Sequence, residues 1–332
     1  MTDKPIVIAG AGAVGCFVGG MLAREGRPVR LLVRPRVAAE IEASGLRVSS
    51  FEGLDERIEA SKLGLSQNPN VFESAAIVLV TVKSGDTPEV AELMARHMPA
   101  DAVVVSLQNG VGNAAVLRER LPGRAVLAGM VPFNVLALGD GRYHRATSGD
   151  ILIDADRADT AAKLSVPGLG VRAHPDMAGV QWGKLLLNLN NAMNALSNLP
   201  LRDQLAQHGW RTLWADQMAE ALQVMRIAGI KPIAATPLPA SWSPSILRLP
   251  DALFQLVARR MVKVDPKARS SMWQDLQRGR RTEIDYLQGA IIALAVKHGV
   301  AAPLSGRILS LIKDAEAAGK GTPGLTPEQI RG

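Results

Sequence analysis

Groups that can hold a small anion and move a proton are concentrated in one stretch near the C-terminus. Ser270-Ser271 is followed by Arg280-Arg281, Thr282 and Glu283. Hydroxyl and guanidinium groups bind carboxylates and other small anions, and a carboxylate can orient a neighbouring cation. Glu283 has a second interpretation, because acidic residues favour helix starts and Thr282 is a suitable N-cap with Asp285 three positions later. The stretch predicts a site for a small anionic molecule.

A second polar group lies within an apolar helical segment, Trp182–Asn194. It consists of one lysine and four asparagines: Lys184, Asn188, Asn190, Asn191 and Asn194. The spacing of Lys184, Asn188 and Asn191 places them on one helix face, beside a second pair formed by Asn190 and Asn194. Such a face indicates a ligand, a subunit contact or water. A lysine among apolar neighbours has a lowered pKa and can donate a proton to an oxygen that gains negative charge.

A glycine fingerprint near the N-terminus indicates a dinucleotide cofactor. Gly10, Gly12 and Gly15 have G-x-G-x-x-G spacing, directly after an apolar strand at residues 4–9 and at the start of a helix. The first glycine allows a tight turn, the second lets the backbone approach a pyrophosphate, and the third lets the helix pack on the sheet. The fingerprint names a cofactor class but no reaction.

Three further residues follow predicted strands and are candidates for cofactor contacts. The second strand ends in Arg34, where NAD-binding folds usually carry an acid, and a guanidinium binds a 2′-phosphate. We therefore predict NADP(H), although Arg36 could serve instead or Arg34 could face solvent. Lys83 and Asn109 follow two later strands, where ligands bind in open α/β sheets. Either could instead cap a helix or face water.

The order of elements predicts an α/β fold: an N-terminal Rossmann domain with a doubly wound parallel sheet, followed by an all-helical C-terminal domain. Strands alternate with helices up to about residue 131, which is typical of a parallel sheet covered on both faces. The predicted strands are 4–9, 28–33, 76–82, 102–107, 125–131, 151–153 and 171–173. The predicted helices of the second half are 177–197, 208–228, 251–263, 267–278 and 283–298. We expect domains at 1–175 and 176–332.

Two segments of the second half are predicted to lack regular structure. Residues 231–250 contain five prolines, which disfavour helix, so a loop is expected there, either a lid or a linker. The tail from Gly319 is rich in glycine and proline and is expected to fray.

Composition restricts the class of protein. The 332 residues carry a net charge of +7, which favours anionic partners, but no nucleic-acid-binding signature is present. The single cysteine, Cys16, suits a reducing cytoplasm and is expected in the core. Ile6–Ala23 is free of charge but holds five glycines, so the fingerprint explains it better than a membrane span. The five histidines are scattered, which predicts no metal site.

Over nearly its whole length the chain resembles the ketopantoate reductase (2-dehydropantoate 2-reductase) family. The specific motifs are Asn-Gly-Val-Gly at 109–112, Trp-x-Lys-Leu-x-x-Asn at 182–188, and Ser-Ser-Met-x-Gln-Asp with Thr-Glu-Ile-Asp-Tyr at 270–286. The resemblance implies NADPH-dependent reduction of a small anionic 2-oxo acid, most simply 2-dehydropantoate in pantothenate biosynthesis, by a cytoplasmic enzyme. A homodimer is a possible assembly.

The resemblance also implies roles for individual residues. It assigns Lys184 as the catalytic lysine and Glu283 as the carboxylate of the site. It assigns substrate contacts to Ser271, to Asn188 and to a second asparagine, Asn194 or Asn191. It assigns cofactor contacts to the residues already singled out: Arg34, Lys83 and Asn109.

The chain departs from the family pattern on the substrate side. Ala192 stands where the second asparagine is usual, Ala268 stands where another asparagine is frequent, and 231–250 looks like an addition. A same-fold reductase of a different 2-oxo or imino acid is therefore an alternative. A non-catalytic NADP(H) sensor is a further one, which Lys184 and Glu283 argue against.

Overall fold

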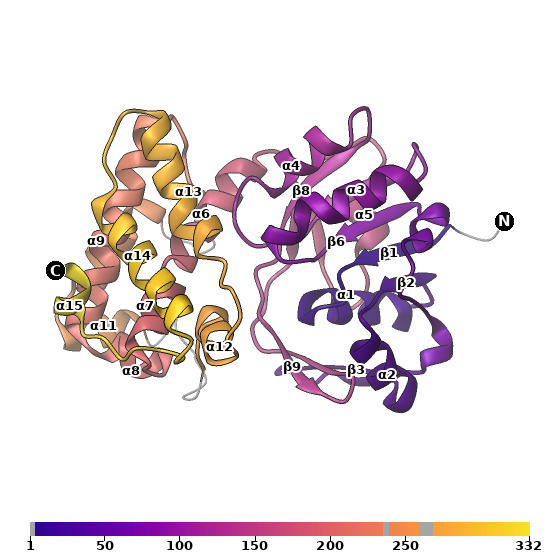
Figure 1. The fold of residues 1–332 in the computed structure, drawn as a ribbon, viewed down its shortest axis with the longest axis horizontal. Coiled ribbons are helices and arrows are strands. Elements are labelled where there is room, and N and C mark those ends of the chain that lie inside the picture. The colour runs from indigo at the N-terminus through magenta and orange to yellow at the C-terminus, as the bar shows by residue number, and fades with distance from the viewer. Residues whose placement is uncertain (1–3, 235–238, 259–267) are drawn as a thin grey trace. The chain divides into compact units, whose positions relative to one another are not determined.

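The computed structural model describes residues 4–234, 239–258 and 268–332. The chain forms two compact units, Met1–Met177 and Ala178–Gly332. The first contains both sheets and the second is helical (Figure 1). Within the described residues, no helix is long and apolar enough to cross a membrane.

The described part of the first unit has an eight-stranded sheet in the order β12-β11-β8-β7-β6-β1-β2-β5. Its neighbours are parallel except β11 and β8. The central strands are wholly apolar and buried, as expected for a sheet covered on both faces. The strands are β1 (Ile6–Ala9), β2 (Val29–Leu32), β5 (Leu63–Ser66), β6 (Ile77–Val80), β7 (Val103–Ser106), β8 (Val126–Met130), β11 (Ile151–Asp154) and β12 (Val171–His174). The predicted doubly wound sheet is confirmed.

The strand order changes direction at β1, which lies between β2 and β6. Ala9 at the end of β1 is in register with both Leu32 and Val80, and Val80 is in register with Ser106. The carboxyl ends of these strands therefore share one edge, where ligands bind in such sheets. The first four helices of this unit are α1 (Ala13–Arg24), α2 (Pro35–Ser44), α3 (Thr87–His97) and α4 (Asn113–Arg120).

A second sheet, which the sequence reasoning missed, covers the other side of α1. Its order is β4-β3-β10-β9, with β3 (Leu46–Ser50), β4 (Asp55–Ile58), β9 (Val135–Gly139) and β10 (Arg142–Arg145). A Cβ on Gly19 would lie 3.2 Å from Ile8 of the large sheet, and one on Gly20 would lie 2.7 Å from Val48 of the small sheet. Helix α1 is thus packed on both faces. The uncharged run Ile6–Ala23 is a strand followed by this buried helix.

The second unit is built from helices around an apolar core. Trp210, Leu213, Ile284 and Ile308, from three different helices, are at most 3% exposed. The helices are α6 (Met177–Asn188), α7 (Asn190–Ser197), α8 (Leu201–Ala206), α9 (His208–Ile227), α10 (Ser243–Leu247), α11 (Asp251–Ala258), α12 (Ser271–Gln277), α13 (Ile284–Lys297), α14 (Pro303–Ala318) and α15 (Pro327–Arg331). The helical character is confirmed, but the predicted helix 177–197 is two helices separated by Leu189. The predictions for 259–267 lie outside the described residues.

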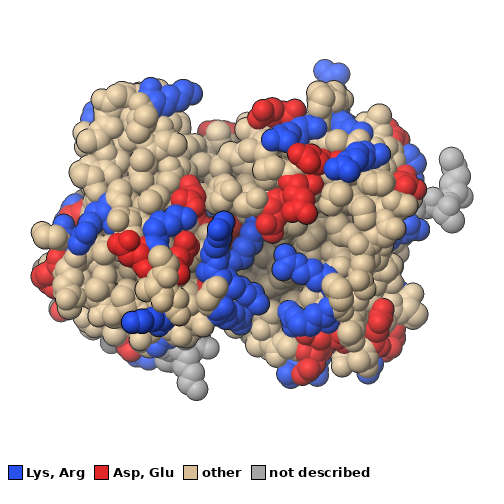
Figure 2. Space-filling view, viewed as in Figure 1, with Lys and Arg blue, Asp and Glu red and all other residues tan. Residues whose placement is uncertain are grey.

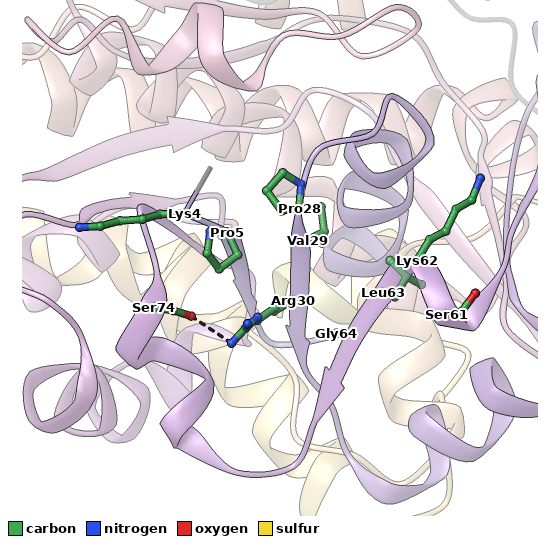
Figure 3. Close-up of a pocket in the computed structure, with 10 residues that line it drawn as sticks. All are labelled: Lys4, Pro5, Pro28, Val29, Arg30, Ser61, Lys62, Leu63, Gly64 and Ser74. Atoms are coloured by element: carbon green, nitrogen blue, oxygen red, sulfur yellow. Dashed lines mark hydrogen bonds between the residues drawn. The ribbon is translucent and has the colours of Figure 1, made fainter. Parts of the chain in front are cut away.

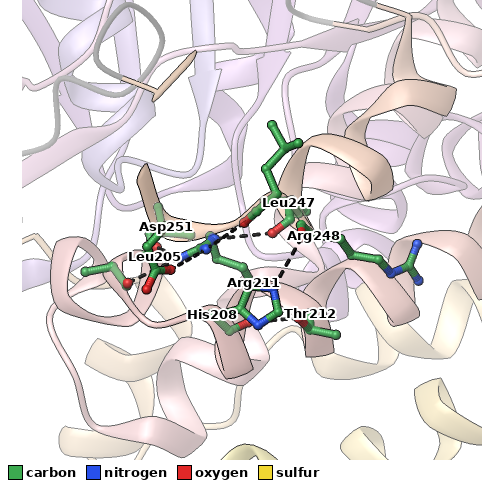
Figure 4. Close-up of polar contacts among 9 residues, drawn as sticks. Leu205, His208, Arg211, Thr212, Leu247, Arg248 and Asp251 are labelled. Carbon is green, nitrogen blue, oxygen red and sulfur yellow. Dashed lines mark hydrogen bonds and ion pairs between the residues drawn. The ribbon is translucent and has the colours of Figure 1, made fainter. Parts of the chain in front are cut away.

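The proline-rich segment 231–250 is more ordered than expected where it is described. Residues Ser243–Leu247 form α10, with Pro244 in its first turn, where the missing N–H costs nothing. The fully buried Arg211 of α9 donates a hydrogen bond to the carbonyl of Leu247 at 3.2 Å (Figure 4). It donates another to the carbonyl of Leu249 at 3.0 Å. The same guanidinium pairs with Asp251 at 2.7 Å. Residues 240–251 are therefore fixed to α9, which corrects the expectation of a loop without helix.

The C-terminal tail is also ordered, so the prediction of fraying was wrong. Helix α15 begins with a capping box in which Thr326 and Gln329 bond each other's backbone. Ile330 is fully buried in the core of the helical unit. The burial of Ile330 and the capping box stabilise this helix enough to order it, despite the glycines and prolines that precede it.

Candidate functional site

The three fingerprint glycines form the geometry that a dinucleotide requires. Gly10 has φ +105°, a region that L-residues avoid. A Cβ on Gly15 would lie 2.4 Å from the Gly10 carbonyl oxygen and 2.5 Å from Thr81 Oγ1. A Cβ on Gly12 would meet no atom within 4 Å. Gly15 therefore serves packing, whereas the open space beside Gly12, at the N-terminus of α1, leaves room for a bound phosphate.

Arg34 lies where the cofactor's adenine ribose is expected. It is exposed and is the N-cap residue of α2, immediately beyond β2, and neither Val33 nor Pro35 beside it is acidic. Arg36, the alternative phosphate ligand, forms an ion pair with Glu40. This arrangement favours Arg34 over Arg36 as the residue for a 2′-phosphate.

Asn109 is held in an exposed turn by a buried polar network. The Asn109 carbonyl accepts hydrogen bonds from Ser84 Oγ (3.1 Å) and from Asn113 Nδ2 (2.8 Å). Ser84 follows Lys83, so the network also joins the Lys83 turn to the Asn109 turn. Thr87 and Gln108 extend it at 2.7 Å. The sequence reasoning gave Ser84 and Asn113 no role, although a polar residue at each of two helix starts was visible.

Cys16 is fully buried on α1, as predicted. Burial raises the pKa of its thiol to about 12, and a thiol that stays protonated is a poor nucleophile. Cys16 is a packing residue.

The described residues contain no group of three or more His, Cys, Asp or Glu that could hold a metal ion.

Lys184, the predicted catalytic lysine, projects from α6 and is half-buried. Burial lowers the pKa of its ammonium from 10.5 to about 8. The backbone of Ile233 crosses α6 next to it, where Ile233 N–H donates to the Gly179 carbonyl at 2.8 Å. A Cβ on Gly183 would lie 1.8 Å from the Ile233 oxygen, so only glycine fits there. Because burial lowers it to about 8, the pKa of Lys184 is near the range that suits proton transfer.

Asn188, the last residue of α6, is half-buried, and so is Asn191. Asn194 differs, because it is fully buried on α7. Its amide donates to the Leu199 carbonyl and to Gln204 Oε1, both at 3.0 Å, and its Oδ1 accepts from the Ser270 N–H at 2.9 Å. An amide so enclosed offers nothing to a ligand. We therefore do not retain Asn194 as a direct substrate contact.

Asn194 instead positions the start of α12. Ser270 Oγ donates to the Asn191 carbonyl at 2.9 Å and accepts from the Trp273 N–H at 3.1 Å. Ser270 is thus an N-cap fixed to α7 on two sides. The exposed Ser271, the predicted substrate residue, follows it directly. The sequence reasoning singled out this serine pair but not its tie to the asparagines.

Glu283 is the half-buried N-cap residue of α13. The predicted capping box of Thr282 with Asp285 is not formed, although Thr282 Oγ1 accepts a hydrogen bond from the Ile284 N–H at 3.3 Å at the start of the helix. Thr282 Oγ1 donates to Glu316 Oε1 at 2.6 Å, and Asp285 pairs with Lys313. Because Thr282 and Asp285 are engaged by α14, Glu283 is not part of a capping box.

A groove of about 620 Å³ lies at the opposite edge of the large sheet from the fingerprint (Figure 3). It is lined by the amino ends of β1, β2 and β5, with Lys4, Arg30 and Lys62 among its residues. Arg30 donates to Ser74 Oγ at 3.0 Å and Lys4 pairs with Asp101. The groove contains none of the predicted site residues.

Basic side chains appear on both units, and acidic side chains lie beside many of them (Figure 2). Arg47 pairs with Asp55, and Arg248 with Asp216. Pairing of this kind reduces the long-range field that a polyanion would need.

A dinucleotide-binding sheet and a separate helical unit with a half-buried lysine define a class of nicotinamide-dependent oxidoreductases. The family model described as "Ketopantoate reductase PanE/ApbA" matches residues 6–157. The model described as "Ketopantoate reductase PanE/ApbA C terminal" matches residues 176–316. The chain belongs to the ketopantoate reductase family, and the resemblance seen in the sequence is confirmed.

Individual relatives agree with this assignment. A PanE/ApbA family ketopantoate reductase of known structure from Ralstonia eutropha JMP134 is 34% identical, with a TM-score of 0.80 over 95% of this chain and 99% of that one. A 2-dehydropantoate 2-reductase of Halobacterium salinarum is 29% identical over 95% of this chain and 99% of its own length. D-mandelate dehydrogenase with NADH and anilino(oxo)acetate, at 21% identity and a TM-score of 0.78 over 95% of this chain and 99% of that one, shares the fold.

Proposed function

We propose that this protein catalyses NADPH-dependent reduction of a 2-oxo acid to a 2-hydroxy acid, specifically 2-dehydropantoate to pantoate in pantothenate biosynthesis. The observation that carries the proposal is the match of the two ketopantoate reductase family models to residues 6–157 and 176–316, the second of which includes the half-buried Lys184. The family and the relatives named 2-dehydropantoate 2-reductase support the choice of reaction.

Lys184 acts as the proton donor. When bound, the reduced nicotinamide supplies a hydride to the carbonyl carbon, and negative charge develops on the carbonyl oxygen. The Lys184 ammonium stabilises this charge and transfers a proton to the oxygen. Asn188, one helical turn along α6, donates a hydrogen bond to the same oxygen. Ser271 binds the substrate carboxylate or a substrate hydroxyl, and Glu283 orients Lys184 or binds a substrate hydroxyl.

The cofactor is held by the sheet unit. The turn at Gly10 and Gly12 accommodates the pyrophosphate, Gly15 lets α1 pack closely against this turn, and the Asn109 turn contacts the nicotinamide ribose or the substrate. Arg34 binds the 2′-phosphate, and this residue supports NADPH over NADH because no acid is beside it to repel the phosphate. Lys83 contributes a second positive charge near the cofactor.

A different 2-oxo acid is the second candidate substrate, and one observation favours it. Position 192, where the family usually has an asparagine, is a fully buried alanine, and Asn194 is engaged by Gln204 and Ser270. Position 192 therefore supplies no side-chain amide, and the amide of Asn194 is not available to a substrate. D-Mandelate dehydrogenase shows that the same fold accepts another oxo acid.

The test is oxidation of NADPH, and separately of NADH, by the purified protein with a panel of 2-oxo acids. The panel includes 2-dehydropantoate, phenylglyoxylate and pyruvate, and absorbance of the reduced nicotinamide is followed. We expect the highest kcat/KM for 2-dehydropantoate with NADPH. A preference for another oxo acid would make that acid the proposed substrate in place of 2-dehydropantoate. Binding of NADPH without turnover of any oxo acid would favour a non-catalytic sensor.

A further inference from the structure

Gln288 lies in the interior of the helical unit, on α13, and is fully buried. Its Nε2 donates a hydrogen bond to the Leu189 carbonyl at 2.9 Å. The two residues are 99 positions apart in the chain. The bond therefore joins α13 to the segment between α6 and α7.

The two ends of this bond lie next to proposed site residues. Leu189 is the single residue between α6 and α7. It directly follows Asn188, which lies one helical turn after Lys184. Gln288 is in the second turn of α13, which begins after Glu283. A displacement of Leu189 would move Asn188 first and would also change the orientation of α6.

Stability alone does not account for an amide at position 288. The Oε1 atom of Gln288 is buried and has no hydrogen-bond partner in the described part of the chain. A buried unpaired acceptor costs about 1–3 kcal/mol, whereas one intramolecular hydrogen bond contributes about 0.5–1.5 kcal/mol. An apolar side chain of similar volume would avoid the first cost. By these magnitudes the bond adds little to net stability, so its consequence is expected in the placement of Leu189 more than in the free energy of unfolding.

We propose that Gln288 is a positioning residue: its hydrogen bond to Leu189 fixes the end of α6, and so Asn188 and Lys184, relative to Glu283 at the start of α13. This inference rests on the proposed function of those three residues. A misplacement of reacting groups by about 1 Å can lower a rate about 100-fold. The bond is one contact that prevents such a displacement.

The test compares Gln288→Met with a matched control, Gln217→Met. Gln217, on α9, is also fully buried, and neither atom of its amide has a partner within the described residues. We expect Gln288→Met to lower kcat for the 2-oxo acid about 10- to 100-fold with NADPH affinity unchanged. Gln217→Met should keep kcat within about twofold. Equal losses in the two variants, or an unchanged kcat in Gln288→Met, would overturn the proposal.

Gln288→Glu supplies a second readout that a role in stability alone would not change. Burial raises the pKa of a carboxyl group. While protonated, the new side chain can donate to the Leu189 carbonyl as glutamine does, and once ionised it can only accept. The activity of this variant relative to wild type should therefore fall as pH rises. A ratio that is independent of pH and as low as that of Gln288→Met would contradict a donor role.

Failure of the proposed function can be told apart from failure of this inference. If the wild-type protein reduces no 2-oxo acid, the proposed function is wrong. Amide hydrogen exchange at residues 186–193 still tests the tie, because Gln288→Met should speed exchange there and Gln217→Met should not. Unchanged exchange in Gln288→Met would show that the hydrogen bond does not hold this junction.

Discussion

Replacing Lys184 by methionine should stabilise the protein near neutral pH while it lowers turnover about 10²- to 10⁴-fold. Burial lowers the pKa of this ammonium from 10.5 to about 8. Each pKa unit corresponds to about 1.4 kcal/mol, so keeping Lys184 charged in the folded state costs up to about 3 kcal/mol. Because the side chain is only half-buried, we expect a gain of about 1–3 kcal/mol in the free energy of unfolding.

The gain should depend on pH in a defined direction. Below about pH 8 both the folded and the unfolded chain carry the charge, and the folded state bears the full cost. Between about 8 and 10.5 the folded lysine is neutral and the unfolded one is still protonated, so wild-type stability attributable to this group rises with pH. The advantage of Lys184→Met should therefore shrink over this range.

Urea unfolding at several pH values measures this directly. Lys320→Met, at an exposed position of the same unit, is the control and should change stability by less than about 0.5 kcal/mol. A Lys184→Met protein that is less stable than wild type at neutral pH would refute burial as the cause of the lowered pKa. So would an advantage that does not vary with pH.

The remaining predictions concern the cofactor and the framework. Arg34→Ala should weaken NADPH binding about 10-fold or more and leave NADH binding unchanged, whereas Arg36→Ala should affect neither; equal losses for both nucleotides would assign the phosphate elsewhere. Gly12→Ala should weaken NADPH binding with little change in Tm. Gly15→Ala should instead destabilise the fold by about 1–3 kcal/mol, because its Cβ would meet Gly10 and Thr81. Arg211→Met should cost about 3–5 kcal/mol in urea unfolding by leaving carbonyls and Asp251 unpaired; a smaller loss would mean that water replaces the guanidinium.

The sheet unit could be predicted where local pattern decides structure. The strands at residues 6–9 and 77–80 are continuous apolar runs, and buried parallel strands have that pattern. The small sheet was not found in this way, because β4 is mostly charged and β9, although its sequence is apolar, is mostly exposed. A further signal was α1 itself, whose lack of any polar face required a cover on both sides.

The helical unit shows where sequence reasoning fails for a physical reason. Asn188, Asn191 and Asn194 have the same side chain, and only tertiary partners distinguish them. Asn194 is enclosed by Gln204 and Ser270, whereas Asn188 is half-buried. The interruption at Leu189 has no proline or glycine to mark it. Its carbonyl bonds with Gln288, which is distant in sequence, and such a contact cannot be read from local pattern.

The central claim is that the Lys184 ammonium donates the proton in carbonyl reduction, and single-turnover oxidation of bound NADPH by Lys184→Ala tests it most directly. General acid catalysis contributes about 10²- to 10⁴-fold, so the variant should react slower by that factor with 2-dehydropantoate, while its Kd for NADPH stays within about twofold of wild type. A single-turnover rate equal to that of wild type would contradict the assignment of Lys184 and the mechanism built on it.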